Sequence, residues 1–226
     1  MVLRNTEIGL PAGETWLDGI LAHHPQVPGL IVLLERSGST LNTSRGAFVK
    51  AALNSADFAT LQVALLSHEE ERKNPEVWRR VSTLAPRIEA VLEWIDHQPA
   101  LKKLPLGVLA RDAATAAMIR VAARASSPPD ALASRSGRPD LAGLEPLQAL
   151  ATPLLLVTGE LDDEGPGPNQ QAYEQLSCPR ELAVIEGASH AFEELGTLEE
   201  ASQRIVTWFQ RWLCPRDGTA PTAVPS

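Results

Sequence analysis

Residues 104–125 read LPLGVLARDAATAAMIRVAARA, and this stretch decides the fold. The short apolar run Leu104–Leu109 predicts a buried strand, and the small-residue run Ala113–Ala125 predicts a helix directly after it. Between the two lies a tight turn with Asp112 at its apex. A strand followed at once by a helix is the repeating unit of a parallel sheet covered by helices.

The sequence on both sides repeats this alternation. Expected strands cover residues 5–10, 15–22, 29–34, 58–66, 104–109, 130–134, 153–158 and 181–185, and expected helices cover 45–55, 75–97, 113–125, 168–177 and 197–213. Residues 11–14 join the first two strands as a hairpin. Pro86 should kink or split the helix 75–97. The pattern predicts an α/β fold with a mostly parallel sheet and helices on both faces.

Length and composition limit the domain organisation and the partners. The 226 residues suit one domain, expected to span residues 1–213, before a tail of residues 214–226 that is expected to be disordered. The formal net charge is −8 and no basic run occurs, so we expect no binding to nucleic acid or to a membrane. The expected partner is a small-molecule substrate or ligand, and the expected assembly is a monomer or a homodimer.

Cysteine content and the N-terminus favour a cytoplasmic location. Cys178 and Cys214 form neither a zinc-type spacing nor a disulfide framework. No signal-peptide pattern is visible at the N-terminus. No cofactor is implied, because residues 165–168 lack the strand–helix context of a phosphate-binding loop. A metal site at residues 162–164 would be unspecific, so none is predicted.

Polar residues follow three of the expected strands at the end where parallel sheets bind ligands. The elbow turn places Asp112 between the small residues Ala110 and Ala114, which a sharp strand-to-helix turn requires. Asp162 follows a later strand, and His190 follows the last one. A histidine oriented by an acid suits base catalysis. The alternatives are a helix N-cap for Asp112, a solvated acidic loop for Asp162 and an ordinary loop histidine.

The loop after residue 34 is the candidate for transition-state stabilisation. It contains Glu35, Arg36, Ser37 and Ser39, and in a hydrolase it supplies one oxyanion-hole N–H while Ala113 supplies the other. The alternative is a flexible serine- and glycine-rich loop without a chemical role.

These motifs resemble the dienelactone hydrolase-like family of the α/β hydrolases, over residues 29–213. The resemblance is carried by SGS at 37–39, SRSGRPDLA at 134–142, GELD at 159–162 and GASHAFEE at 187–194. It implies an α/β-hydrolase fold without a large cap domain and an ester- or lactone-type substrate. It also implies that Asp112, Asp162 and His190 occupy the nucleophile, acid and base positions of a catalytic triad.

Two departures from the family pattern leave the function open. Similar proteins carry His-Gly where this chain has Glu35-Arg36, and Ser or Cys where it has Asp112. Glu35 resembles a family glutamate that interacts with the catalytic thiol. The primary prediction is an ester or lactone hydrolase with weak or modified activity, in which Asp112 acts as a general base on water. The alternative is a catalytically degenerate binding protein.

A third reading makes Asp112 a nucleophile toward carbon, as in haloalkane dehalogenases and epoxide hydrolases. The connection 134–153 is too short for the cap domain of those enzymes. The segment 134–142 is instead expected to form a surface loop that lines the pocket. Arg135 or Arg138 would then bind a substrate carboxylate, and the alternative is a structural salt bridge to an acid such as Asp140.

Overall fold

The structure, a computed structural model, describes residues 4–38, 41 and 43–214. Its strands are β1 Arg4–Ala12, β2 Thr15–His23, β3 Leu30–Ser37, β4 Ala59–Leu66, β5 Leu106–Arg111, β6 Ala131–Gly137, β7 Leu154–Gly159 and β8 Arg180–Ile185. Its α-helices are α1 Ser44–Ser55, α2 His68–Lys73, α3 Val81–Asp96, α4 Asp112–Arg124, α5 Leu144–Ala149, α6 Pro166–Gln175 and α7 Thr197–Leu213. Two 3-10 helices, η2 Pro75–Arg79 and η3 Pro139–Ala142, complete the order.

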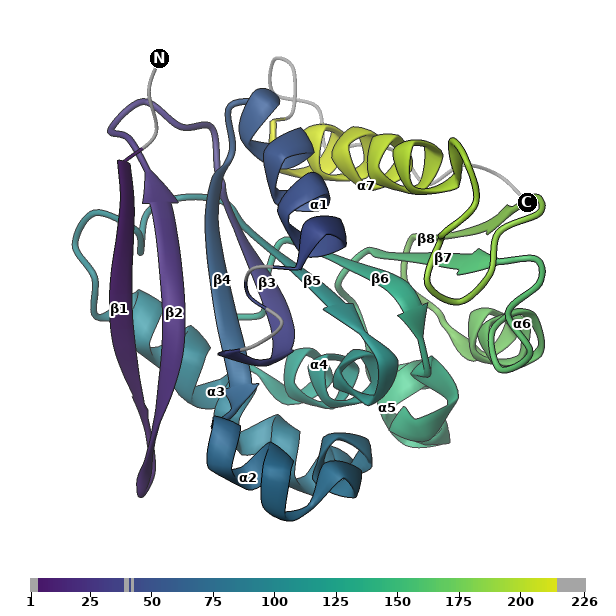
Figure 1. The fold of residues 1–226 in the computed structure, drawn as a ribbon, viewed down its shortest axis with the longest axis horizontal. Helices are drawn as coiled ribbons and strands as arrows, with labels where there is room; N and C mark the ends of the chain where they lie inside the picture. Colours follow the sequence, from purple (N-terminus) through teal and green to yellow (C-terminus); the bar gives the residue numbers. More distant parts are fainter. Residues whose placement is uncertain (1–3, 39–40, 42, 215–226) are drawn as a thin grey trace.

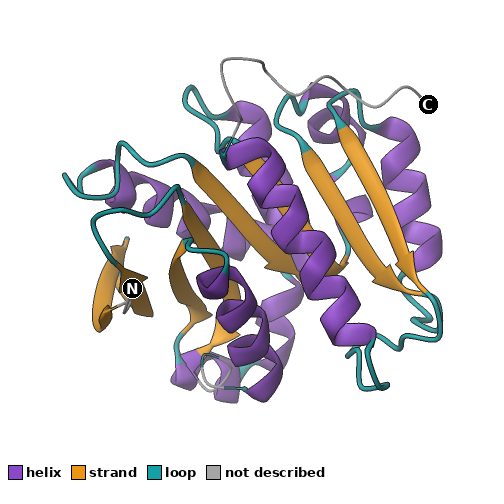
Figure 2. Cartoon of the chain, turned by 90° about the horizontal axis from the view of Figure 1, so that it is seen from above, coloured by secondary structure: helices purple, strands orange, loops and turns teal. Residues whose placement is uncertain are grey.

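The strands form one sheet in the order β1-β2-β4-β3-β5-β6-β7-β8. The hairpin β1–β2 is antiparallel, β2 pairs antiparallel with β4, and every later pair is parallel. Figures 1 and 2 show helices on both faces of this sheet. The predicted fold class is therefore confirmed. The parallel part places the ends of β3, β5, β7 and β8 along one edge, where the polar loops were expected.

Two hydrophobic clusters, one on each face, hold the helices to the sheet. Leu84 and Ile88 of α3 and Ile119 of α4 pack in the first cluster. Leu53 of α1 and Phe209 of α7 pack in the second. The strands between the clusters are buried on both sides, which explains why β7 begins as a continuous apolar run over residues 154–157 rather than an alternating one.

Two sequence predictions about local structure are wrong. The expected helix 75–97 is divided at Arg80 into η2 and α3, whereas Pro86 lies inside α3. The segment 134–142 is not a surface loop, because β6 continues to Gly137 with all seven of its residues buried, and η3 follows. A Cβ atom at Gly137 would lie 2.0 Å from Ser134 Oγ and 2.2 Å from Thr115 Oγ1, so α4 approaches β6 as closely as only glycine permits.

No helix in the described part of the chain combines the length and the apolar character needed to cross a membrane. Residues 215–226 of the expected tail lie outside the described residues, so its expected disorder stays a prediction.

Candidate active site

The elbow between β5 and α4 holds Asp112 in a left-handed conformation. Its φ is +49°, which is uncommon for a residue other than glycine. Asp112 is the first residue of α4, and the N-cap, Arg111, makes no capping bond through its side chain. The N-cap alternative for Asp112 is therefore wrong. Ala110 and Ala114 are buried on either side, as the tight turn requires.

Asp112, His190 and Asp162 meet at the ends of β5, β8 and β7. His190 Nδ1 lies 2.9 Å from Asp162 Oδ2, and His190 Nε2 lies 3.1 Å from Asp112 Oδ1. The Asp162 carboxylate is nearly fully buried, and its Oδ1 accepts a hydrogen bond of 3.2 Å from the backbone N–H of Glu164. The histidine thus lies between two carboxylates, one on each ring nitrogen.

This placement changes the protonation of both partners. The hydrogen bond to Asp112 is the main cause that raises the pKa of His190, and it outweighs the opposite effect of burial. Burial alone would raise the pKa of Asp112, but the hydrogen bond from His190 and the charge of Arg111 lower it overall. Both shifts favour the charged forms of His190 and Asp112, so the hydrogen bond between them stabilises an imidazolium–carboxylate pair.

Two more donors reach Asp112 that sequence reasoning did not assign. Trp78 Nε1 of η2 donates to Asp112 Oδ2 at 3.1 Å, and Arg111 Nε donates to the same oxygen at 3.2 Å. Trp78 is 34 residues from Asp112 in sequence, and no sequence motif marked it as a site residue. Arg111 stood in the quoted turn, but nothing in the sequence indicated where its side chain points.

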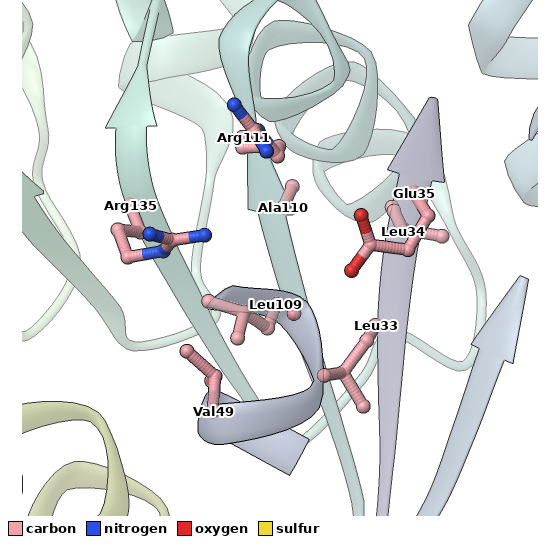
Figure 3. A pocket seen from close by; sticks show the side chains of 9 residues that line it. Leu33, Leu34, Glu35, Val49, Leu109, Ala110, Arg111 and Arg135 are labelled. Carbon is pink, nitrogen blue, oxygen red and sulfur yellow. The ribbon is translucent and has the colours of Figure 1, made fainter. Parts of the chain in front are cut away.

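A small pocket opens beside this site, shown in Figure 3. Glu35 of β3, Arg111 of β5 and Arg135 of β6 supply its charged groups, and Leu33, Leu34, Gly46, Val49, Leu109 and Ala110 line the rest. Its empty volume, open mouth included, is about 290 Å³. The cavity proper is only about 20 Å³, room for little more than one water molecule, so a ligand could place only a small group in it.

Burial is the main cause of the pKa shifts of Glu35 and Arg135 in this pocket. It raises the pKa of Glu35, although the Arg111 and Arg135 guanidiniums oppose the change. It also lowers the pKa of Arg135 to about 10, so this side chain stays a cation at neutral pH. The Arg135 guanidinium lies 5.7 Å from the ring centroid of Phe192. Within the described residues, no carboxylate lies within the 4 Å ion-pair distance of Arg135.

The remaining residues predicted for the oxyanion loop and elbow differ in where the structure places them. Ala113 is buried directly after Asp112, and Ser37 is buried at the end of β3. Arg36 pairs through Nε with Glu71 Oε1 of α2 at 2.8 Å and does not line the pocket. Ser39 lies outside the described residues.

Arg138 is held in salt bridges. Two of its nitrogens bind the Asp140 carboxylate at 2.9 and 2.8 Å, and the third binds Glu164 at 3.1 Å. The structural salt-bridge alternative therefore applies to Arg138, and its assignment as a substrate-binding residue is corrected. Arg135 and Arg138 separate because the first is on buried β6 and the second follows its end.

The described residues contain no group of three or more His, Cys, Asp or Glu side chains arranged to hold a metal ion. In the loop after β7, Asp162 is engaged by His190 and Glu164 by Arg138.

The eight-stranded sheet, the left-handed elbow and the acid–histidine pair at later strand ends are the architecture of an α/β hydrolase. The fold matches the crystal structure of a dienelactone hydrolase from Anabaena variabilis with a TM-score of 0.87 and 30% sequence identity, over 94% of this chain and 99% of that one. This chain belongs to the dienelactone hydrolase-like family.

More distant structures share the fold alone. Est1E from Butyrivibrio proteoclasticus matches with a TM-score of 0.74 and 13% identity, over 92% of this chain and 99% of that one. A serine hydrolase without a lid from Xanthomonas campestris matches with a TM-score of 0.73 and 16% identity, over 95% of this chain and 97% of that one.

The curated relatives come from two strains of Mycobacterium tuberculosis and are provisionally named phosphoribosyl transferases. They are 35% identical over 212 residues, which are 94% of this chain and 47% of theirs. The chain thus spans about half the length of these relatives. No family model matches the chain.

Proposed function

We propose that this protein hydrolyses a small ester or lactone at Asp112, His190 and Asp162, by a modified mechanism. One observation carries the proposal: His190 hydrogen-bonds Asp112 through Nε2 at 3.1 Å and Asp162 through Nδ1 at 2.9 Å. This is the connectivity of a nucleophile–histidine–acid triad, with a carboxylate at the first position. The likeness to a dienelactone hydrolase over nearly the whole chain supports the reaction class.

A carboxylate in the first position changes the chemistry. Its attack on an ester carbonyl would form an anhydride, a poor route compared with a serine or thiol acyl-enzyme. His190 is also less available as a base here, because the Asp112 hydrogen bond raises its pKa and favours the imidazolium, which has no free lone pair to accept a proton. The group at the elbow that accepts a proton is then Asp112, and the group that donates one is His190.

The reaction follows from these two roles. Asp112 takes a proton from water while the water oxygen bonds to the acyl carbon. The bond from that carbon to the leaving oxygen breaks, and His190 Nε2 gives its proton to the leaving oxygen. The proton on Asp112 then returns to His190, so the products are a carboxylic acid and an alcohol. Asp162 stabilises the imidazolium from its Nδ1 side.

Arg135 supports a substrate that carries an anionic group. Its guanidinium is buried and charged, it faces the pocket beside Arg111, and no carboxylate of the described chain pairs with it. A buried cation gains most from an anion that it can bind directly. The same two arginines offset the repulsion that Asp112 and Glu35 exert on a developing oxyanion.

A binding protein without turnover is the second candidate, and one observation favours it. Both oxygens of Asp112 are engaged, Oδ1 by His190 and Oδ2 by Trp78 and Arg111. A carboxylate with this many donors is a weaker base than a free one, because the donors stabilise its ionised form. The transferase activity in the names of the mycobacterial relatives is no part of the proposal, since those names describe chains about twice as long.

The test is steady-state hydrolysis of a carboxylate-bearing lactone by the wild type and by Asp112→Asn and His190→Ala variants. We expect slow wild-type turnover that falls about 100-fold in either variant, the range of a lost acid–base group. Asp163→Asn removes an exposed acid of the loop after β7 and should leave the rate unchanged. Arg135→Gln should raise KM for the anionic lactone but not for a neutral one.

Two outcomes would contradict this function. Turnover that survives both Asp112→Asn and His190→Ala would place the active site elsewhere. Absent turnover on every ester and lactone, with the anionic compound still bound in an Arg135-dependent manner, would favour the binding protein.

A further inference from the structure

Residues 136–138 at the end of β6 contact the segments that carry Asp112 and His190. Ser136 Oγ donates a hydrogen bond of 2.6 Å to the backbone carbonyl of His190. Two residues on, the backbone N–H of Arg138 donates to the backbone carbonyl of Asp112 at 3.0 Å. The same short segment therefore touches the elbow on one side and the histidine loop on the other.

The segment also reaches the acid of the site through one buried amide. Asn169 Nδ2 of α6 donates to the carbonyl of Gly137 at 3.0 Å and to the carbonyl of Gly165 at 2.8 Å. Gly165 in turn donates its N–H to the carbonyl of Asp162 at 2.9 Å. Hydrogen bonds thus connect all three site residues to residues 136–138, two of them directly and Asp162 through Asn169 and Gly165.

Ser136 adopts a conformation that side chains rarely take. Its φ is +50°, and the residue is buried. Such a backbone costs free energy and persists where the surroundings hold it. The next residue, Gly137, packs its backbone against the side chains of Thr115 and Ser134, where a Cβ atom would have no room. The turned backbone directs the Ser136 hydroxyl at the histidine loop instead of along the strand.

We propose that Ser136 is a positioning residue, whose hydroxyl fixes the His190 backbone and so sets the distances from the imidazole to Asp112 and Asp162. Its effect on catalysis rests on the proposed function. Its effect on the imidazole does not, because the hydrogen bonds to the two carboxylates are present whether or not a reaction follows.

The experiment measures the imidazole directly. Protein labelled with ¹⁵N in histidine is titrated by NMR in the wild type, Ser136→Ala, Ser136→Gly and Ser134→Ala. Loss of the Ser136 hydroxyl should let the loop move, weaken the carboxylate contacts and shift the His190 titration midpoint down toward that of an ordinary histidine. Ser134→Ala is the matched control, since it removes a buried hydroxyl of the same strand that binds Thr115 and not the site.

Ser136→Gly keeps the test decisive if Ser136→Ala folds poorly, because glycine accepts positive φ and still removes the hydroxyl. A His190 midpoint equal to wild type in Ser136→Gly, or an equal shift in Ser134→Ala, would overturn the proposal. With an active wild type, we also expect kcat to fall about tenfold at unchanged KM in Ser136→Gly. A shifted midpoint in a protein without turnover would support the positioning role while the proposed function fails.

Discussion

Among single residues, the aspartate at the elbow has the largest chemical consequence. Asp112→Ser would place a hydroxyl next to His190 Nε2, with Asp162 still bound to Nδ1. With the Asp112 carboxylate gone, the cause that most raises the His190 pKa is removed, so more of the histidine is the neutral imidazole that can accept the serine proton.

We therefore expect the wild type to be nearly inert toward p-nitrophenyl acetate, a neutral ester, and Asp112→Ser to gain measurable activity. Adding Glu35→His and Arg36→Gly should increase the gain, since these changes restore the family pattern at the oxyanion loop. Steady-state assays of each variant with and without His190→Ala test this. A gain that persists without His190 would contradict the assignment of the base.

The same histidine should make stability depend on pH. The folded pKa of His190 is raised above its unfolded value, so its contribution is fully present below about pH 6.5 and is lost as pH rises through the folded pKa. Asp112 acts in the opposite sense, because its folded pKa is lowered and its contribution is lost only in acid. The stability advantage of the wild type over His190→Gln should therefore shrink from pH 6 to pH 9.

Urea unfolding of both proteins across that range measures the effect. In an Asp112→Asn background the pH dependence should be smaller, because the partner with the largest effect on His190 is gone. An advantage that grows with pH would show that His190 is held as the neutral imidazole.

Among the elements, α3 contains a proline, Pro86, which is unfavourable inside a helix. Pro86 is exposed in the interior of the helix, where it removes one backbone hydrogen bond and crowds the preceding turn. Pro86→Ala should stabilise the protein by about 2 kcal/mol, since the helical gain exceeds the smaller cost of a freer unfolded chain. Urea denaturation provides the value. A loss of stability would instead indicate that the packing of α3 requires a bend at Pro86.

For the molecule as a whole, the packing of α7 on the sheet is the contact to test. Phe209 is fully buried, and a Cβ atom on Gly107 of β5 would lie 2.6 Å from its ring. Phe209→Ala should cost about 3–5 kcal/mol, because this close fit leaves a cavity that the sheet cannot fill. Phe48→Ala in α1 is the control, and its cost should be much smaller because that side chain is 39% exposed. Similar losses at both positions would contradict this account of the core.

The sequence by itself determined the features that depend on neighbours along the chain. Apolar runs of strand length and the helical spacing of residues 197–213 predicted the strands and α7, because burial imposes those periods locally. The elbow was recognised from Ala110, Asp112 and Ala114 for the same reason. Asp162 and His190 were found because each follows a strand of a parallel sheet, and those strands end at one edge.

Only the tertiary structure decided how side chains from distant segments meet. Trp78 reaches Asp112 across 34 residues, and Ser136 reaches His190 across 54. The order of the strands also brings Glu35 and Arg135 to one pocket, while Arg36 turns to Glu71 and Arg138 to Asp140. The physical reason is that the direction of each of these side chains depends on tertiary packing, and at Asp112 and Ser136 also on a positive φ angle. The hydrophobic pattern of the sequence encodes neither.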